Sequence, residues 1–219
     1  MSQREFERLA EDALPMRLAA AANRLDKEFD GIYERDAIEA ALEESAEALS
    51  PNGVTPYVHI LAERFTRERL TALAYAEGRL AKTAPQIVFV SLTGGGRAQI
   101  GAALLARRLG SAVDVHCAGS DPSAEIDENV KAALSEVGID ISEGFTRPLT
   151  SEVLAGADVV VTMGRSVGEV EIPATTRHLD WRVGDPAGAD LDEVRHVRDE
   201  IEGRVDVLAE ELTGGSQPI

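Results

Sequence analysis

The chain has 219 residues, 44% of them hydrophobic, and a formal net charge of −17 at pH 7. This length suffices for one large domain, or for a domain with a smaller companion. The acidic balance argues against nucleic-acid binding, because phosphate backbones require a basic surface. No apolar run approaches the ~20 residues of a membrane span. We therefore expect no membrane binding. The single cysteine excludes an internal disulfide, which favours a cytoplasmic protein.

Apolar residues recur at helical spacing throughout residues 1–84. Pro15 is expected to end a first helix and to open a second one. A third helix is predicted from Asp36, and a fourth over about 56–82. We interpret 1–84 as a small helical bundle that packs on itself. Dimerisation or partner binding through the same apolar stripes is the alternative.

From Gln86 onward the pattern changes to alternating strands and helices, which favours a parallel sheet. We therefore predict an α/β domain over 85–212, with a parallel four-stranded sheet flanked by helices, and a disordered tail at 213–219. The strands are expected at 86–91, 112–117, 158–163 and 177–181, and the helices near 98–109, 126–137, 151–156 and 190–212.

One stretch carries most of the chemical information: the glycine loop, residues 91–97. A buried apolar strand leads into it, and three consecutive glycines allow its backbone to adopt positive φ and to approach a ligand. A helix follows, whose first amides lack partners and can bind an anion. The guanidinium fork of Arg97 would close over a tetrahedral oxyanion. The predicted anion-binding residues are Leu92, Thr93, Gly94, Gly95, Gly96, Arg97 and Ala98.

Ser91 and Arg97 enclose five residues, which resembles the Cys-x5-Arg phosphate loop of the low-molecular-weight protein tyrosine phosphatases and arsenate reductases. The resemblance covers 86–212, and residues 1–84 resemble the bundle that precedes some arsenate reductases. By that analogy we expect a homodimer. Further segments resemble the family in the same order: Cys-Ala-Gly-Ser at 117–120, Glu-Val-Gly-Ile-Asp at 136–140, Ala-Asp-Val-Val-Val-Thr-Met at 157–163, Asp-Pro at 185–186 and a closing helix around 193–201.

The resemblance implies that Arg97 holds the oxyanion and that Asp185 is the general acid. It also implies a cysteine nucleophile, whose thiolate the loop stabilises, but Ser91 stands at that position. A serine hydroxyl is far less acidic than a free cysteine thiol, whose pKa is ~8.5. No histidine adjacent in sequence offers Ser91 a base.

Three polar residues that brace the loop in the phosphatases are also replaced. Gly94, Ala98 and Cys117 stand at their positions. We expect Gly94 to adopt the left-handed conformation at no steric cost, so that the loop keeps its shape and its amides without that network. Cys117 is interpreted as a buried residue, with a displaced nucleophile as the alternative.

These features favour a protein that binds phosphate, arsenate or sulfate in the glycine loop, with lost or much reduced catalysis. An active arsenate reductase or phosphatase, or a Cys-to-Ser form of one, is the alternative. It would use a thiol reductant, either thioredoxin or a low-molecular-weight thiol. A regulatory or dimerising protein with an empty loop is a third possibility. No cluster has metal-ligand spacing, so we expect no metal and no bound cofactor.

Overall fold

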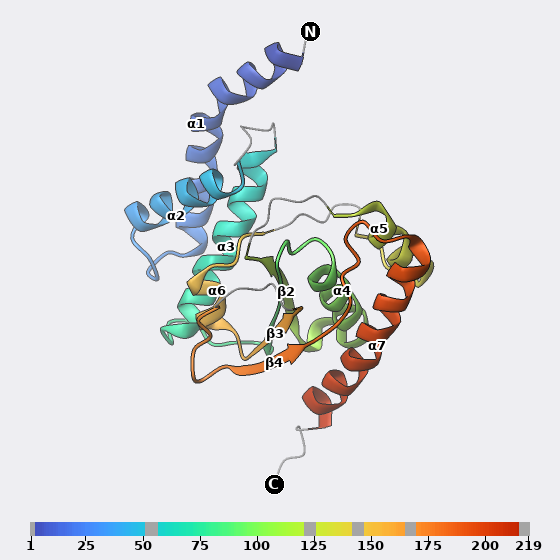
Figure 1. Ribbon diagram of the computed structural model, residues 1–219. Helices are drawn as coiled ribbons and strands as arrows, with labels where there is room; N and C mark the ends of the chain where they lie inside the picture. Colours follow the sequence, from blue (N-terminus) through green and yellow to red (C-terminus); the bar gives the residue numbers. More distant parts are fainter. Residues whose placement is uncertain (1–2, 51–56, 121–125, 142–146, 165–169, 215–219) are drawn as a thin grey trace. The chain divides into compact units, whose positions relative to one another are not determined.

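The computed structural model describes residues 3–50, 57–120, 126–141, 147–164 and 170–214. The chain forms two compact units, residues 1–81 and 82–219. The first unit contains α1 (Gln3–Glu28), α2 (Arg35–Ala48) and α3 (Val58–Ala76) (Figure 1). The second contains β1 (Gln86–Ser91), α4 (Arg97–Leu109), the 3-10 helix η1 (Gly110–Ala112), β2 (Asp114–Gly119), α5 (Glu128–Glu136), α6 (Ser151–Gly156), β3 (Val159–Met163), β4 (Arg177–Trp181) and α7 (Leu191–Gly214).

The three helices of the first unit pack around an apolar core. Leu25 of α1, Phe29 just after that helix, Ile38 of α2 and Ala62 of α3 are all buried there. α1 runs through Pro15 without a break, so the predicted helix boundary at this proline is wrong. Proline removes one backbone hydrogen bond from a helix. Beyond the proline, α1 buries Ala21, Ala22 and Leu25 against the other two helices, and this packing favours a continuous α1.

The second unit is built on four parallel strands in the order β2-β1-β3-β4, which confirms the predicted fold class. β2 begins two residues later than expected, because Gly110–Ala112 forms a 3-10 turn first. α7 extends through Thr213 and Gly214, which the sequence pattern had assigned to a disordered tail. Residues 215–219 of that predicted tail lie outside the described residues. Within the described segments, no helix is both long and apolar enough to cross a bilayer.

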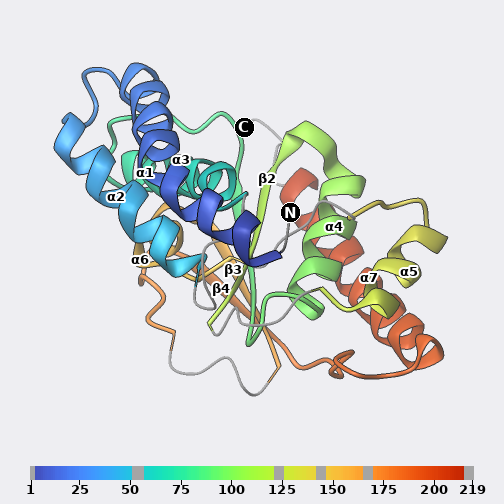
Figure 2. The ribbon, with the colours of Figure 1, turned by 90° about the horizontal axis from the view of Figure 1, so that it is seen from above.

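Helices cover both faces of the sheet, and alternate residues of the central strand β1 face them. Ile87 and Phe89 belong to the larger core with α4, α5 and α7, whereas Val88 and Val90 pack with residues of α6. Figure 2 shows α4, α5 and α7 together on one side of the strands and α6 on the other. This burial on both faces explains the uninterrupted apolar sequence of β1.

The loops that follow the four strands, including the glycine loop, leave the sheet at one edge. Because all four strands are parallel, their carboxyl ends lie along the same edge. The chain passes from β1 to β2 on one side of β1 and later returns to β3 on its other side. The glycine loop therefore lies at a topological switch point, the place where open α/β sheets bind ligands.

The close packing of α4 on β1 gives a first prediction, for Gly101→Ala. A Cβ atom at Gly101 would lie 2.7 Å from Cδ1 of Phe89, whose ring is fully buried and 5.7 Å from that of Trp181. Overpacking of this kind should lower the free energy of unfolding by ~1–3 kcal/mol. Urea denaturation measures the change. Gly203→Ala in α7 is the control, since its Cβ would meet nothing within 4 Å; it should be neutral or stabilising by up to ~1 kcal/mol. Equal effects from both substitutions would contradict the prediction.

Candidate functional site

The glycine loop packs backbone against backbone on the end of β2. Gly94 has φ +71°, the left-handed conformation expected from the sequence. A Cβ atom on Gly94 would lie 2.7 Å from the amide nitrogen of Gly119, and one on Gly119 would lie 2.5 Å from the carbonyl oxygen of Thr93. Real Cβ atoms do not come this close to backbone, so both positions require glycine. These contacts fix the loop without the polar network that the sequence lacks.

Ser91 ends β1 and lies inside the loop, with 2% of its surface exposed. Its Oγ accepts a hydrogen bond from the Gly94 amide at 3.2 Å, and its carbonyl oxygen accepts one from the Ser120 amide. Among the described residues, Gly94 is the one partner of this hydroxyl. A loop amide thus already donates to the atom at the nucleophile position, and no described base contacts it.

The helix α4 begins directly after the glycines. Its N-cap, Gly96, provides no side-chain cap, and the first turn contains no acidic residue. The first bond of the helical pattern runs from the amide of Ile100 to the carbonyl oxygen of Gly96 at 3.0 Å. The amides of the first turn therefore lack acceptors within the helix and carry a partial positive charge. An anion in the loop would satisfy them.

Arg97 is 7% exposed. Its Nη2 lies 3.1 Å from Oδ2 of Asp185. On another side the guanidinium lies against Gly164, at the end of β3, where a Cβ atom would be 2.3 Å from Nη1. The charged end of Arg97 is thus enclosed by the segments that follow β3 and β4.

Asp185 reaches this position through an Asp-Pro turn. Its Oδ1 accepts a hydrogen bond from the Ala187 amide at 3.2 Å, and its side chain is 59% exposed. The ring of Pro186 lies over Gly96, where a Cβ atom would be 3.0 Å from Cγ. The Asp-Pro turn therefore packs on the glycine loop, and the structure brings together the predicted residues Arg97 and Asp185.

Other candidate groups lie elsewhere. His178 is hydrogen-bonded to Thr162 at 2.8 Å, and His116 contacts Gln86 at 3.3 Å. Cys117 is buried in the larger core, in accord with its interpretation as a core residue. The described residues contain no group of three or more His, Cys, Asp or Glu side chains placed to hold a metal ion.

Three residues that shape the site were given no role there by sequence reasoning: Gly119, Gly164 and Pro186. Each acts through a contact with a segment distant in the chain. The site roles of two of them could have been inferred from their place at the ends of predicted strands, because Gly119 ends β2 and Gly164 directly follows β3. The carboxyl ends of neighbouring parallel strands meet beside the loop after β1.

The ion pair gives a second prediction, for Asp185→Asn. An anion held by Arg97 would lie close to the Asp185 carboxylate, and like charges about 4 Å apart in water repel by ~1 kcal/mol. Removing the charge should tighten phosphate binding roughly 3- to 10-fold, as measured by calorimetric titration. Asp206→Asn, which removes a carboxylate that pairs with Arg108 in the second unit, should leave affinity unchanged. Weaker binding in Asp185→Asn would show that the carboxylate supports the anion.

The comparisons with known proteins agree with this fold and loop. Residues 86–217 match the family "low molecular weight phosphotyrosine protein phosphatase", and residues 18–74 match the N-terminal domain of protein-tyrosine-phosphatase-like proteins. The first match spans more than half of the chain. The chain therefore belongs to the low molecular weight phosphotyrosine protein phosphatase family.

Several of the family members similar to this chain are arsenate reductases. A thioredoxin-dependent arsenate reductase of Corynebacterium glutamicum is 35% identical, with a TM-score of 0.82, and the alignment covers 91% of this chain and 98% of that one. A putative arsenate reductase of Halobacterium salinarum is 33% identical over 129 residues, 57% of this chain and 90% of its own length. A solved arsenate reductase in the phosphate binding state has a TM-score of 0.53 at 26% identity, covering 58% of this chain and 98% of that one.

Proposed function

We propose that the glycine loop binds a free tetrahedral oxyanion, namely phosphate, arsenate or sulfate, and that thiol-based turnover has been lost. The observation that carries the proposal is the convergence of three groups on one loop: the uncapped start of α4, the enclosed guanidinium of Arg97 and the hydroxyl of Ser91. Amides and a guanidinium bind an oxyanion through charge-assisted hydrogen bonds. The similarity to an arsenate reductase in its phosphate binding state supports this assignment.

The loss of turnover follows from the chemistry of Ser91. The family's reaction needs a nucleophile that is ionised near neutral pH, and a thiol reaches that state far more readily than a hydroxyl. A serine nucleophile needs an adjacent base, and within the described segments its hydroxyl contacts the Gly94 amide alone. Leu92, the next residue, is 36% exposed, and its side chain offers no proton acceptor.

One observation favours the second candidate, an active arsenate reductase or phosphatase. Asp185 lies beside Arg97, where an acid could donate a proton to a departing oxygen. Arsenate reduction would also need electrons from a thiol, either thioredoxin or a low-molecular-weight thiol, since the chain has one cysteine and it is buried in the core. Arsenate-dependent oxidation of reduced thioredoxin by the native chain would establish this candidate.

Binding is tested by calorimetric titration of the intact chain with phosphate and arsenate at low salt. We expect saturable binding with one anion per chain. Salt weakens anion sites of this kind, so affinity should fall as chloride concentration rises. No heat at millimolar ligand would refute the assignment and leave a protein with an empty loop, which was the third possibility.

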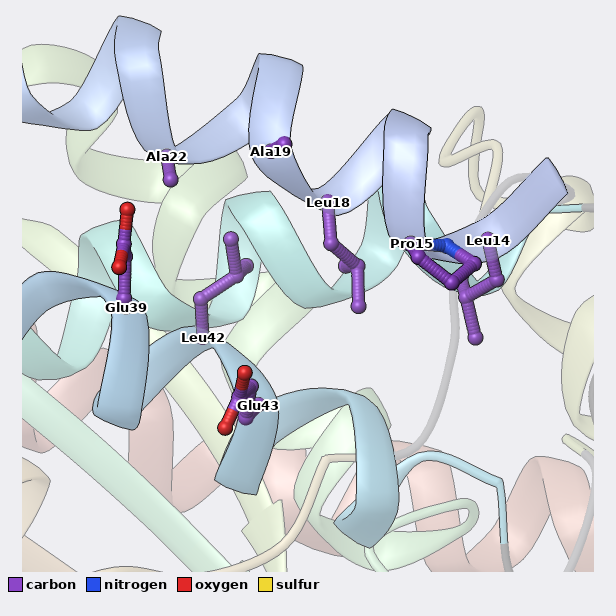
Figure 3. Close-up of a pocket in the computed structure, with 8 residues that line it drawn as sticks. All are labelled: Leu14, Pro15, Leu18, Ala19, Ala22, Glu39, Leu42 and Glu43. Atoms are coloured by element: carbon purple, nitrogen blue, oxygen red, sulfur yellow. The ribbon is translucent and has the colours of Figure 1, made fainter.

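We further propose that the first unit joins two copies of the chain. α1 and α2 line a pocket of about 340 Å³, to which α1 contributes Leu14 and Leu18 and α2 contributes Leu42 (Figure 3). Met16, on the same stretch of α1, is 73% exposed. In a two-fold dimer each Met16 side chain would enter the partner's pocket, because the same patch meets itself.

Sedimentation equilibrium tests this dimer. Met16→Glu should give monomers at concentrations at which the native chain is dimeric. The control is Val207→Glu, which adds the same charge at an exposed apolar residue of α7. A monomeric native chain, or a dimer unaffected by Met16→Glu, would refute the proposal.

A further inference from the structure

We propose that Gly164 is a positioning residue: its missing side chain creates the slot that holds the Arg97 guanidinium, and this slot sets the strength of oxyanion binding. The inference rests on the proposed function. It adds a specific determinant of affinity, located 67 positions away in the sequence, at the end of a different strand.

The contact between the two residues is unusually close. A Cβ atom at Gly164 would lie 2.3 Å from Nη1, 2.6 Å from Cζ and 3.0 Å from Nη2 of Arg97. All three distances are to the charged head group, so its flat side lies against the backbone of Gly164. No amino acid with a side chain fits at this position while Arg97 keeps its place.

The backbone of Gly164 is the fixed partner in this contact. Its amide donates to the carbonyl oxygen of Trp181 at 3.1 Å, which continues the pairing of β3 with β4. Its φ of +90° favours glycine independently of the contact. The guanidinium, in contrast, is the far end of a flexible side chain. A Cβ atom would therefore displace Arg97 and leave the strand in place.

A displaced Arg97 has limited room. Asp185 contacts Nη2 on the exposed side of the slot, and the remainder of the arginine is buried. Movement away from Gly164 turns the guanidinium toward Asp185 and solvent. The two parallel N–H groups then no longer point at an anion held by the loop amides, and the bidentate contact is lost.

The test compares Gly164→Ala with Gly138→Ala. Both substitutions place alanine where φ is positive, and a Cβ atom at Gly138, with φ +79°, would meet nothing within 4 Å. The two variants should therefore lose similar stability from backbone strain, measured by thermal unfolding. Phosphate affinity, measured by calorimetry, should fall at least 10-fold in Gly164→Ala and less than twofold in Gly138→Ala. Equal affinity in the two variants would overturn the inference.

Two further measurements separate this inference from the proposed function. In an Arg97→Ala background, Gly164→Ala should cause no additional loss of affinity, because the slot is then empty; a further 10-fold loss would show another role. Without any anion, phenylglyoxal should modify Arg97 several-fold faster in Gly164→Ala than in Gly138→Ala, as quantified by peptide mass spectrometry. If Gly164→Ala does not change the rate of Arg97 modification, the slot is contradicted, whether or not the native chain binds phosphate. If the rate rises but the native chain binds no anion, the slot is supported and the proposed function is refuted.

Discussion

Arg97→Ala is expected to weaken phosphate binding roughly 100-fold, which corresponds to ~2.8 kcal/mol. Hydrogen bonds to charged groups contribute ~1.5–3 kcal/mol each, and the guanidinium can make two to one oxyanion. Because Arg97 is 7% exposed, water competes little for its head group. The substitution also leaves Asp185 without its ion-pair partner and with a charge that repels the anion. Calorimetric titration of phosphate measures the loss.

Two variants isolate the role of the guanidinium. Arg108→Ala makes the same change of charge in the same helix, at a half-exposed residue that pairs with Asp206, and should leave affinity within twofold of native. The double variant Arg97→Ala/Asp185→Asn removes both members of the ion pair. If it binds phosphate more tightly than Arg97→Ala does, the difference in affinity measures the repulsion between the anion and the Asp185 carboxylate. A loss in Arg97→Ala no greater than that in Arg108→Ala would remove Arg97 from the site.

Ser91→Cys should give the chain phosphatase activity on the order of 1,000-fold above that of native protein, because it restores an ionisable nucleophile. Gly94 already donates to the atom at this position, and the guanidinium of Arg97 belongs to the same loop. Both stabilise a thiolate, so the pKa of the introduced thiol should fall below the ~8.5 of free cysteine. Phosphate released from phenyl phosphate measures the activity, and absorbance at 240 nm against pH measures the thiol ionisation.

The leaving group of this reaction needs a proton, and Asp185 is placed to donate it. The thiolate would attack phosphorus while the bond to the phenolic oxygen breaks, and that oxygen needs a proton as it leaves. Water would then attack the phosphocysteine, break the S–P bond and release inorganic phosphate. Asp185→Asn in the Ser91→Cys background should therefore slow turnover at least ~10²-fold, the usual contribution of a general acid, although the same substitution is expected to tighten phosphate binding. Ser91→Ala serves as the inactive reference. A Ser91→Cys chain that binds phosphate but releases none would show that the loop no longer aligns its substrate.

The elements with regular apolar patterns could be predicted from the sequence. β1 was predictable because an apolar run followed by glycines indicates a buried strand and a loop, and α7 because its apolar residues fall at near-ideal helical spacing. The predicted break at Pro15 was wrong because packing outweighed the local preference of proline: the buried face of α1 continues past it with Ala21, Ala22 and Leu25. Thr213 belongs to α7, and its hydroxyl donates to the carbonyl oxygen of Ala209 at 2.8 Å, an arrangement that the composition of the tail does not indicate.

The candidate site, too, could be predicted from the sequence only in part. Ser91, the glycines and Arg97 lie in one continuous stretch, so their spacing carries information about one another. The contacts of Gly164 with Arg97 and of Pro186 with Gly96 join segments about 70 to 90 positions apart. Such contacts depend on the order of the strands, and a single sequence gives no direct sign of which strand ends meet.

The most direct test of oxyanion binding is a crystal structure of the native chain grown with saturating arsenate, with diffraction data collected at the arsenic absorption edge. We predict one anomalous peak in each chain, inside the glycine loop, with arsenate oxygens in hydrogen-bonding distance of the loop amides and of the Arg97 guanidinium. An empty loop in such crystals, or arsenate bound elsewhere while Arg97 stays paired with Asp185, would contradict the account.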